Sequence, residues 1–168
     1  EGSRGIDLSG LILAPMSGYN DQPFRRLCRR FGAVMVYTGL LASNAIVYGP
    51  EPLGSKRSAD MLRFHPEEHP FVIQLFGSDV DVLVDAARRV ETLGPAMIDI
   101  NLGCAKHKVV RTGAGAALLD DVDKIARLFV RLSQALSVPV SGKIRLGWDE
   151  DSRNHIEVAQ ALEANGAA

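Results

Sequence analysis

The sequence predicts an α/β fold of parallel strands and, within that class, a (β/α)8 TIM barrel. Short apolar runs alternate five times with segments of helical periodicity, and the apolar runs hold few polar residues. Such runs are typical of parallel strands that are joined by helical crossovers and covered on both faces. A complete barrel needs eight such units and about 250 residues. We therefore expect residues 1–168 to be the amino-terminal part of a barrel domain, with about the first five βα units.

Composition and charge exclude several classes of protein. Hydrophobic residues make up 46% of the chain, charged residues 23%, and the formal net charge is −1, which excludes a uniformly basic nucleic-acid-binding chain. The two cysteines lack the Cys-x-x-Cys spacing of zinc and redox sites. No apolar run approaches the roughly 20 residues that cross a membrane, and the first residues lack the order of a signal peptide. We expect a reduced, cytoplasmic protein with no membrane segment.

The first unit combines a strand-like run and a helix with a clear start. The run 10–16 is apolar up to Pro15, and Asp21 with Pro23 is typical of a helix N-terminus, so we expect a helix over 22–32. The residues with the i, i+3, i+4, i+7 spacing of an apolar helix face are Phe24, Leu27, Cys28 and Phe31.

The second and third units repeat this pattern. Strands are expected over 33–39 and 70–77, and a short helix near 40–49. The third strand leads into a helix over 79–94, with Asp79 as its N-cap and a glycine at its end.

The fourth and fifth units complete the chain. Strands are expected over 96–103 and 138–147, followed by helices over 122–136 and 152–167. The Asn-Gly pair at 165–166 suits a left-handed helix cap.

Polar side chains follow several of the predicted strands rather than one. They are Gln74, Asn101, Cys104, Lys143 and Arg145. No strand runs into the Gly-x-Gly-x-x-Gly turn that binds dinucleotides in open α/β sheets. Barrel enzymes build their active sites from the loops at the carboxyl ends of the strands, so this distribution favours the barrel over an open sheet.

Four segments carry a resemblance to a known family. In chain order they are LAPMSGYNDQPFRRLCRRFGA (13–33), FVIQLFGSD (71–79), IDINLGCAKHKVVRTGAGAALL (98–119) and VPVSGKIRLGWD (138–149). The chain resembles the amino-terminal part of the flavin-dependent tRNA-dihydrouridine synthases, whose fourth strand reads Asp-apolar-Asn-x-Gly-Cys-Pro before a basic loop. Two positions depart from that family: Ala105 stands where proline is usual, and Gly39 where an acidic residue is common.

This resemblance implies an FMN-binding barrel followed by a helical domain that grips tRNA. The implied reaction reduces the C5–C6 double bond of a uridine in tRNA to 5,6-dihydrouridine, with NADPH reloading the flavin. On this resemblance, we expect the later barrel strands and the helical domain to lie outside residues 1–168. We therefore expect this part alone to bind flavin poorly and to be inactive.

Cys104 is the catalytic residue that the resemblance implies, as the acid that protonates uracil C5. A free thiol has a pKa of about 8.5 and is mostly protonated at neutral pH, so it can act as an acid. Judged without the resemblance, a lone cysteine after a buried strand is more often a small core residue.

The resemblance also implies the flavin contacts. Lys143 would face the pyrimidine edge of the ring, Gln74 would pair with it through an amide that both donates and accepts, and Pro15 and Met16 would lie against it. Asn101 would position flavin or substrate. Each residue also has an alternative role. Lys143 could be a lysine at the barrel rim that reaches solvent, or a lysine that forms a Schiff base. Gln74 could cap the end of its strand, Met16 could pack in the core, and Asn101 could fix its loop by hydrogen bonds to the backbone.

A basic loop follows the cysteine. Lys106, His107, Lys108 and Arg111 lie in it, and Arg145 is expected across the mouth of the site. We interpret Lys106, Lys108, Arg111 and Arg145 as substrate-binding residues, because local positive charge suits a polyanion such as tRNA whose base is flipped into a pocket. The alternative is ordinary solvated loop charge.

Three further features are interpreted as structural. Cys28 is expected in the core, and the arginine doublets of RRLCRR (25–30) on a solvated helix face. His65 and His69 have an i, i+4 spacing, but a proline follows each of them, so no metal site is predicted.

Two other functions stay open at this point. One is a related FMN barrel that acts on a free pyrimidine such as dihydroorotate, which would have less need of a basic loop. The other is a catalytically idle RNA-binding or assembly fragment, with Ala105 and Gly39 as its signs. A partial barrel also exposes strand edges, so we expect self-association of this part when it is alone.

Overall fold

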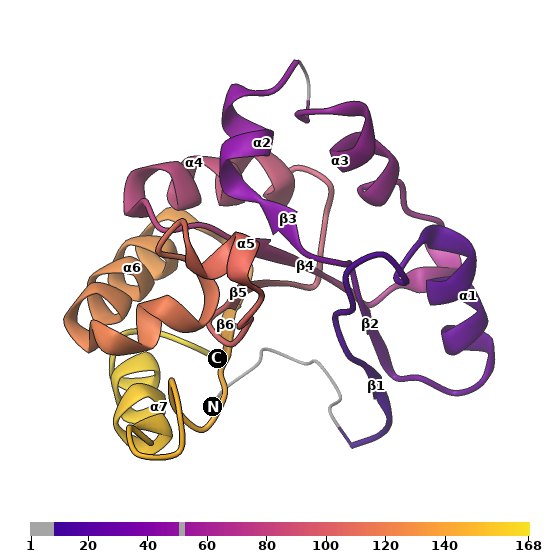
Figure 1. Cartoon of the computed structure of the whole chain (residues 1–168). Helices are drawn as coiled ribbons and strands as arrows, with labels where there is room; N and C mark the ends of the chain where they lie inside the picture. The colour runs from indigo at the N-terminus through magenta and orange to yellow at the C-terminus, as the bar shows by residue number, and fades with distance from the viewer. Residues whose placement is uncertain (1–8, 51–52) are drawn as a thin grey trace.

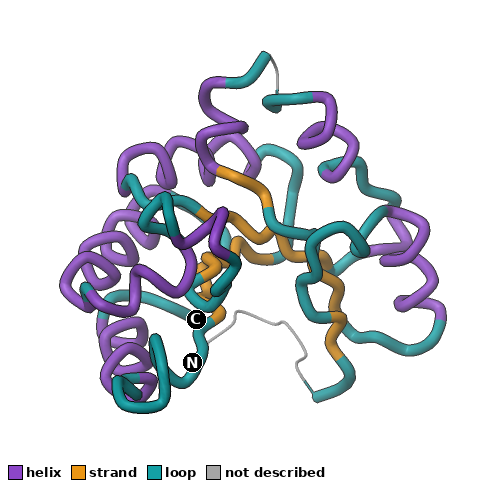
Figure 2. Tube along the Cα trace, in the orientation of Figure 1, coloured by secondary structure: helices purple, strands orange, loops and turns teal. Residues whose placement is uncertain are grey.

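The computed structural model describes residues 9–50 and 53–168 and contains one sheet of parallel strands. Neighbouring strands along the main path also follow one another in the chain, with β3 pairing beside the end of β4. The strands are β1 (Ile12–Leu13), β2 (Met35–Tyr37), β3 (Leu41–Ala42), β4 (Phe71–Phe76), β5 (Met97–Asn101) and β6 (Val140–Lys143). This sequential order, visible in Figures 1 and 2, confirms the five parallel units of a partial barrel.

Helices follow the strands and cover the outside of the sheet. In Figure 1, α4, α6 and α7 lie on one side of the strands, and α1 lies beyond β1 and β2. The α-helices are α1 (Gln22–Arg30), α2 (Ser43–Tyr48), α3 (Lys56–Met61), α4 (Val80–Glu91), α5 (His107–Val110), α6 (Val122–Ala135) and α7 (His155–Ala164). Two short 3-10 helices, η1 (Pro66–Glu68) and η2 (Gly115–Asp120), lie in the connections.

The helix starts follow the predicted capping chemistry. The Asp21 side chain accepts a hydrogen bond from the Phe24 N–H at 2.9 Å, and Asp79 accepts one from the Val82 N–H at 3.1 Å. Each carboxylate thereby satisfies a backbone donor of the first turn. Gly166 after α7 has a φ of +92°, in agreement with the left-handed cap expected at 165–166.

The core lies between the sheet and the outer helices. Its largest cluster joins buried side chains of β4 and β5 to those of α4 and α6, with Ile73, Ile98, Leu83 and Phe129 all fully buried or nearly so. Cys28 is half-buried and packs against this cluster, as expected. The core therefore holds the strand ends, and the residues beyond them, in fixed positions.

The first helix differs from the prediction in which residues it buries. Leu27 is 49% and Phe31 is 82% exposed, whereas Arg25, expected on a solvated face, is completely buried. Arg25 forms an ion pair with Glu68, which is also completely buried. A charged side chain can occupy this position because its charge is paired and its donors are satisfied.

The two ends of the strand path differ. At the β1 end, Leu11 is 78% and Ile12 is 40% exposed. At the β6 end, the Ala168 N–H donates to the Val140 carbonyl at 2.8 Å, so residue 168 lies where a next parallel strand would pair.

Within the described ranges, no helix combines the length and the apolar character needed to cross a membrane.

Candidate functional site

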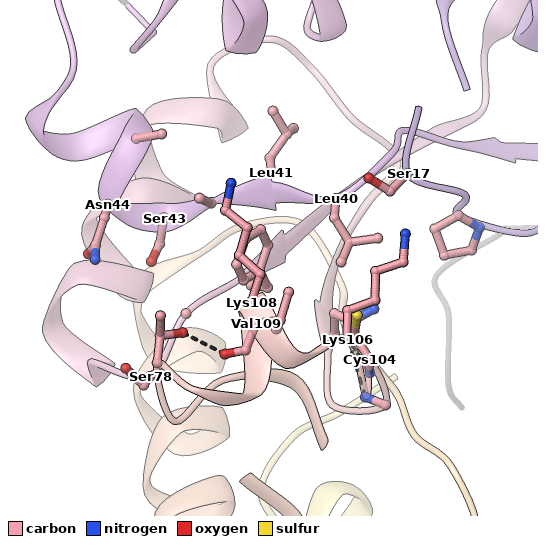
Figure 3. A pocket seen from close by; sticks show the side chains of 18 of the residues that line it. Ser17, Leu40, Leu41, Ser43, Asn44, Ser78, Cys104, Lys106, Lys108 and Val109 are labelled. Atoms are coloured by element: carbon pink, nitrogen blue, oxygen red, sulfur yellow. Dashed lines mark hydrogen bonds between the residues drawn. The ribbon is translucent and has the colours of Figure 1, made fainter. Parts of the chain in front are cut away.

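A cavity of about 790 Å³ lies at the carboxyl ends of the strands. The strand register brings these ends together, because Gln74 pairs with Asp99 and Asn101 with Lys143. The sequence-predicted residues that line the cavity are Pro15, Asn101, Cys104, Lys106, Lys108, Lys143 and Arg145. In Figure 3, Cys104 and Lys106 lie toward one end of the view of this cavity, and Ser43, Asn44 and Ser78 toward the other.

Three other predicted site residues are placed differently. Gln74 is completely buried behind the cavity wall and its amide bonds to Asp99 and Asn101. Met16 is exposed near the start of the loop after β1, and Arg111 is exposed just after α5. None of these three residues belongs to the cavity lining of the described chain.

Backbone hydrogen bonds on both sides hold Cys104 in place. Its N–H donates to Asn101 Oδ1 at 2.9 Å, and its carbonyl accepts from the Ala116 N–H at 3.0 Å. Asn101 Oδ1 also accepts from the Gly103 N–H at 3.3 Å. Cys104 is half-buried and lines the cavity. This arrangement combines two alternatives from the sequence, since Asn101 both ties the loop and lines the cavity.

Gly115 is required by the close approach of the chain to Cys104. It has a φ of +63°, and a Cβ there would lie 2.6 Å from the Cys104 carbonyl oxygen and 2.9 Å from Val109 Cγ1. Any larger residue at 115 must therefore displace the Cys104 backbone, the Val109 side chain of α5, or both.

We expect Gly115→Ala to lower the free energy of unfolding by more than Gly113→Ala. Both positions have positive φ, which costs a non-glycine residue about 1–3 kcal/mol. A Cβ at Gly113 meets only Ser78, at 3.4 Å or more, so the comparison isolates the clashes with Cys104 and Val109. Urea unfolding of the full-length protein measures both variants, and equal losses would contradict the required close approach.

Asp99 lies at the centre of a buried polar network between β4 and β6. It accepts hydrogen bonds from Gln74 Nε2 and from Ser141 Oγ, each at 2.6 Å. Burial raises the pKa of Asp99 to about 6, and the two hydrogen bonds and the charge of Lys143 only partly oppose that rise. Burial, together with the charge of Asp99, also raises the pKa of Tyr37 to about 12, so this phenol stays protonated.

The raised pKa of Asp99 predicts that the free energy of unfolding decreases as the pH rises. For a carboxylate in a surface ion pair, the free energy of unfolding would increase instead. Because the Asp99 pKa of about 6 in the folded protein exceeds the ordinary value near 3.9, the folded state holds this proton more tightly. The contribution to stability is then greatest below about pH 4, falls by about 3 kcal/mol as the pH rises to about 6, and is constant above.

Asp99→Asn is the matched reference for this dependence, because it does not titrate. The difference in unfolding free energy between native protein and variant, measured by urea unfolding from pH 4 to 7, should carry the whole effect. A difference that does not change with pH would show that Asp99 has an ordinary pKa.

Positive side chains surround the cavity. Lys106 and Lys108 come from the segment after β5, and Lys143 and Arg145 from the end of β6 and beyond. Arg57 on α3 adds a fifth, which sequence reasoning missed.

A capping signal in the sequence could have revealed the helix that carries Arg57. The side chain of Ser55, the N-cap of α3, accepts a hydrogen bond from the Ser58 N–H, and a serine before helix-forming residues is typical of a helix start.

The two departures from the family pattern lie beside the cavity and on the cysteine loop. Gly39 is buried, and a Cβ there would lie 3.1 Å from Met61 Cε and 3.2 Å from the Met16 carbonyl oxygen. Ala105 is exposed. An acidic residue at 39 would therefore require Met61 or the loop after β1 to move.

The histidines considered as metal ligands have a structural role at η1. His65 Nδ1 accepts from the Glu67 N–H at 3.2 Å, which caps this short helix. Among residues 9–50 and 53–168, no group of three or more His, Cys, Asp or Glu side chains is arranged to hold a metal ion.

The sequence was compared with those of known protein families. Residues 12–168 match the family described as dihydrouridine synthase. The chain belongs to the dihydrouridine synthase family. This confirms the resemblance drawn from the four sequence segments, and the match spans every strand of the sheet.

Relatives within the dihydrouridine synthase family are similar over nearly the whole chain. The tRNA-dihydrouridine synthase B of Pseudomonas aeruginosa is 42% identical over 156 residues, which is 93% of this chain and 46% of that protein. The protein of the same name from Pseudomonas syringae is 40% identical over 94% of this chain and 45% of its own. A probable tRNA-dihydrouridine synthase of Rhodobacter capsulatus is 38% identical over 93% of this chain and 47% of that protein. The chain thus spans about half the length of these relatives.

A solved structure outside the dihydrouridine synthase family shares the fold. The crystal structure of phosphonopyruvate hydrolase in complex with oxalate and Mg²⁺ superposes with a TM-score of 0.59 at 12% identity, over 94% of this chain and 55% of that one. At this identity the likeness concerns the fold alone.

Proposed function

We propose that the full-length protein reduces uridine in tRNA to 5,6-dihydrouridine, with FMN as cofactor and NADPH as the source of electrons. The observation that carries the proposal is Cys104, held by its backbone at the wall of a cavity at the carboxyl ends of the strands, in a member of the dihydrouridine synthase family. On this proposal, the reaction takes place in the cytoplasm.

The residues around the cavity fit a flavin. A volume of about 790 Å³ lies within the roughly 300–1,000 Å³ of sites for small molecules and cofactors. Lys143 and Asn101 supply a cation and an amide at the wall, and Pro15 an apolar surface. Met16 and Gln74, the other two expected contacts, would act from outside the cavity lining, Gln74 by supporting Asn101. When bound, FMN would supply the hydride that uracil accepts at C6.

Cys104 is the proposed acid of the reaction. A hydride added at C6 leaves negative charge that a proton at C5 neutralises, and the Cys104 Sγ–H can donate that proton. The hydrogen bonds at its N–H and carbonyl fix its backbone, so the thiol starts from a defined position in the cavity wall.

Arg57, Lys106, Lys108 and Arg145 are the proposed contacts with tRNA at the cavity, and Arg111 supports them from the adjoining surface. The chain as a whole has a formal net charge of −1, so attraction of a polyanion depends on this local concentration of positive charge.

The test is the formation of dihydrouridine in tRNA incubated with the full-length protein, FMN and NADPH. Product that requires both FMN and NADPH supports the proposal. A flavin-loaded protein that forms none in unmodified tRNA, and that reduces a free pyrimidine instead, would contradict it.

The exposed strand edges predict how residues 1–168 behave when they are produced alone. Within the described residues, no strand pairs with the outer edge of β1. Its backbone groups, the exposed Leu11 and Ile12, and the exposed Leu27 and Phe31 of α1 and its end favour association with a second copy. We expect dimers or larger species in sedimentation velocity at micromolar concentration. A clean monomer up to high concentration would contradict this expectation.

A further inference from the structure

A relay of hydrogen bonds leads from the cysteine loop into the buried interior. The Cys104 N–H donates to Asn101 Oδ1 at 2.9 Å, and Asn101 Nδ2 donates to Gln74 Oε1 at 3.1 Å. Gln74 Nε2 then donates to Asp99 Oδ2 at 2.6 Å. Gln74 and Asp99 are buried away from the cavity lining, so water does not compete for their groups, and Asn101, which is also buried, is the member of the relay that reaches the cavity.

The relay can run in only one direction. A backbone N–H only donates, so Asn101 must present its oxygen to Cys104 and its NH2 group to Gln74. Gln74 must then present its oxygen to Asn101 and its NH2 group to residue 99. Residue 99 must accept, and a carboxylate oxygen does so strongly. A donor at this point would reverse the Gln74 amide and place two NH2 groups against each other.

The second oxygen of Asp99 belongs to a separate branch. Oδ1 accepts from Ser141 Oγ at 2.6 Å, and Ser141 is in turn hydrogen-bonded to Tyr37. This branch lies on the far side of the carboxylate from Gln74. It stabilises the same buried charge without contacting the cysteine loop, and it therefore offers a control.

We propose that Asp99 is a positioning residue for Cys104: as the terminal acceptor of the relay, it fixes the Gln74 and Asn101 amides and thereby the backbone of the cysteine loop. This extends the proposed function and rests on it only for the role of the thiol. For Gln74 it adds a role in the relay to the flavin contact that the family resemblance implies, because the two relay bonds leave one N–H and one acceptor lone pair of its amide unused.

The test compares Asp99→Ala with Ser141→Ala in the full-length protein, without flavin or substrate. Hydrogen exchange of the amides at 102–105 is measured relative to those of β4, together with the rate of Cys104 alkylation by iodoacetamide, followed by mass spectrometry. Loss of one hydrogen bond predicts that Asp99→Ala speeds exchange at 102–105 by about tenfold and changes the alkylation rate. Ser141→Ala, which leaves the relay intact, should change neither.

Two further variants separate positioning from general loss of stability. Asp99→Asn keeps an oxygen for Gln74 and can turn its NH2 group toward Ser141 Oγ, so both readouts should stay near native. Gln74→Met breaks the relay one step nearer the loop, so it should give the same changes as Asp99→Ala. If Asp99→Ala does not fold, Gln74→Met takes its place in the test.

The outcomes are distinct. The proposal is supported if Asp99→Ala or Gln74→Met shows faster hydrogen exchange at 102–105 and a changed rate of Cys104 alkylation, while Asp99→Asn and Ser141→Ala behave like the native protein. Equal loosening in Ser141→Ala, disruption by Asp99→Asn, or an unchanged loop in the relay-breaking variants overturns it. Because neither readout uses FMN, NADPH or tRNA, failure here leaves the proposed function standing, and failure of the dihydrouridine assay leaves the relay standing.

Discussion

Replacing Cys104 with alanine is expected to lower the rate of dihydrouridine formation by about 10²–10⁴-fold, which is the usual contribution of a positioned general acid. The loop around it should be preserved, because its hydrogen bonds come from the backbone N–H and carbonyl of residue 104 rather than from the thiol. Single-turnover reduction of tRNA by the full-length protein, with flavin already reduced, measures the step concerned.

Cys28→Ala is the matched control for this variant. Cys28 is also half-buried, but it lies on α1 and packs against the core, away from the cavity lining. It should retain activity while losing some stability. A Cys104→Ala protein that reduces uridine at the native rate, or a Cys28→Ala protein equally impaired, would remove the thiol of Cys104 from the reaction.

The parallel units could be predicted from the sequence because apolar runs mark the strands and because the helices α1, α4 and α6 each begin at an aspartate that caps them. Asp79, for example, caps α4 through a bond to a residue only three positions away. Such local chemistry is visible in a single sequence. The short strands were predicted too long: residues 138–147 contain only four strand residues, Val140–Lys143, because apolar character continues past the point where pairing with β5 ends.

The burial of α1 could not be predicted in the same way. An i, i+3, i+4 spacing identifies an apolar face, but the partner of Arg25 is Glu68, 43 positions further along the chain. The position of Gln74 has a similar cause. Its residue type suits a ligand contact, which stays a prediction, and the strand register also places it beside Asp99 and Asn101, to which its amide is hydrogen-bonded. Long-range pairing decides both cases.

Replacing Glu68 with glutamine is expected to lower the free energy of unfolding by about 3–5 kcal/mol, because it leaves the buried Arg25 charge without a counter-charge. Arg25 and Glu68 side chains are both completely shielded from solvent, so water cannot take over the role of the carboxylate. Urea unfolding of the full-length protein, compared with native protein at the same pH, measures the loss.

Glu67→Gln is the control at the neighbouring position. Glu67 pairs with Arg26 and Arg30 at the surface, and its side chain is 40% exposed. Exposed ion pairs contribute about 0–1 kcal/mol, so this variant should be close to native. Equal losses in the two variants would show that the Arg25 charge is solvated in the native protein.

The Arg25 ion pair also bears on the candidate site. Arg25 Nη2 donates to the Arg63 carbonyl at 2.7 Å, and Nη1 donates to the carbonyls of Asn20 and Met61 at 2.8 and 3.3 Å. It thereby joins the loop after β1 to the last residue of α3, Met61, which lines the cavity, and to Arg63 just after that helix. Removing both charges, as in Arg25→Met with Glu68→Leu, would leave three carbonyls without this donor. The bond to the Asn20 carbonyl is buried, and those to Met61 and Arg63 are partly buried; a buried unsatisfied group costs about 1–3 kcal/mol. The double variant should therefore remain less stable than native protein, and full recovery would show that the backbone contacts of Arg25 contribute little.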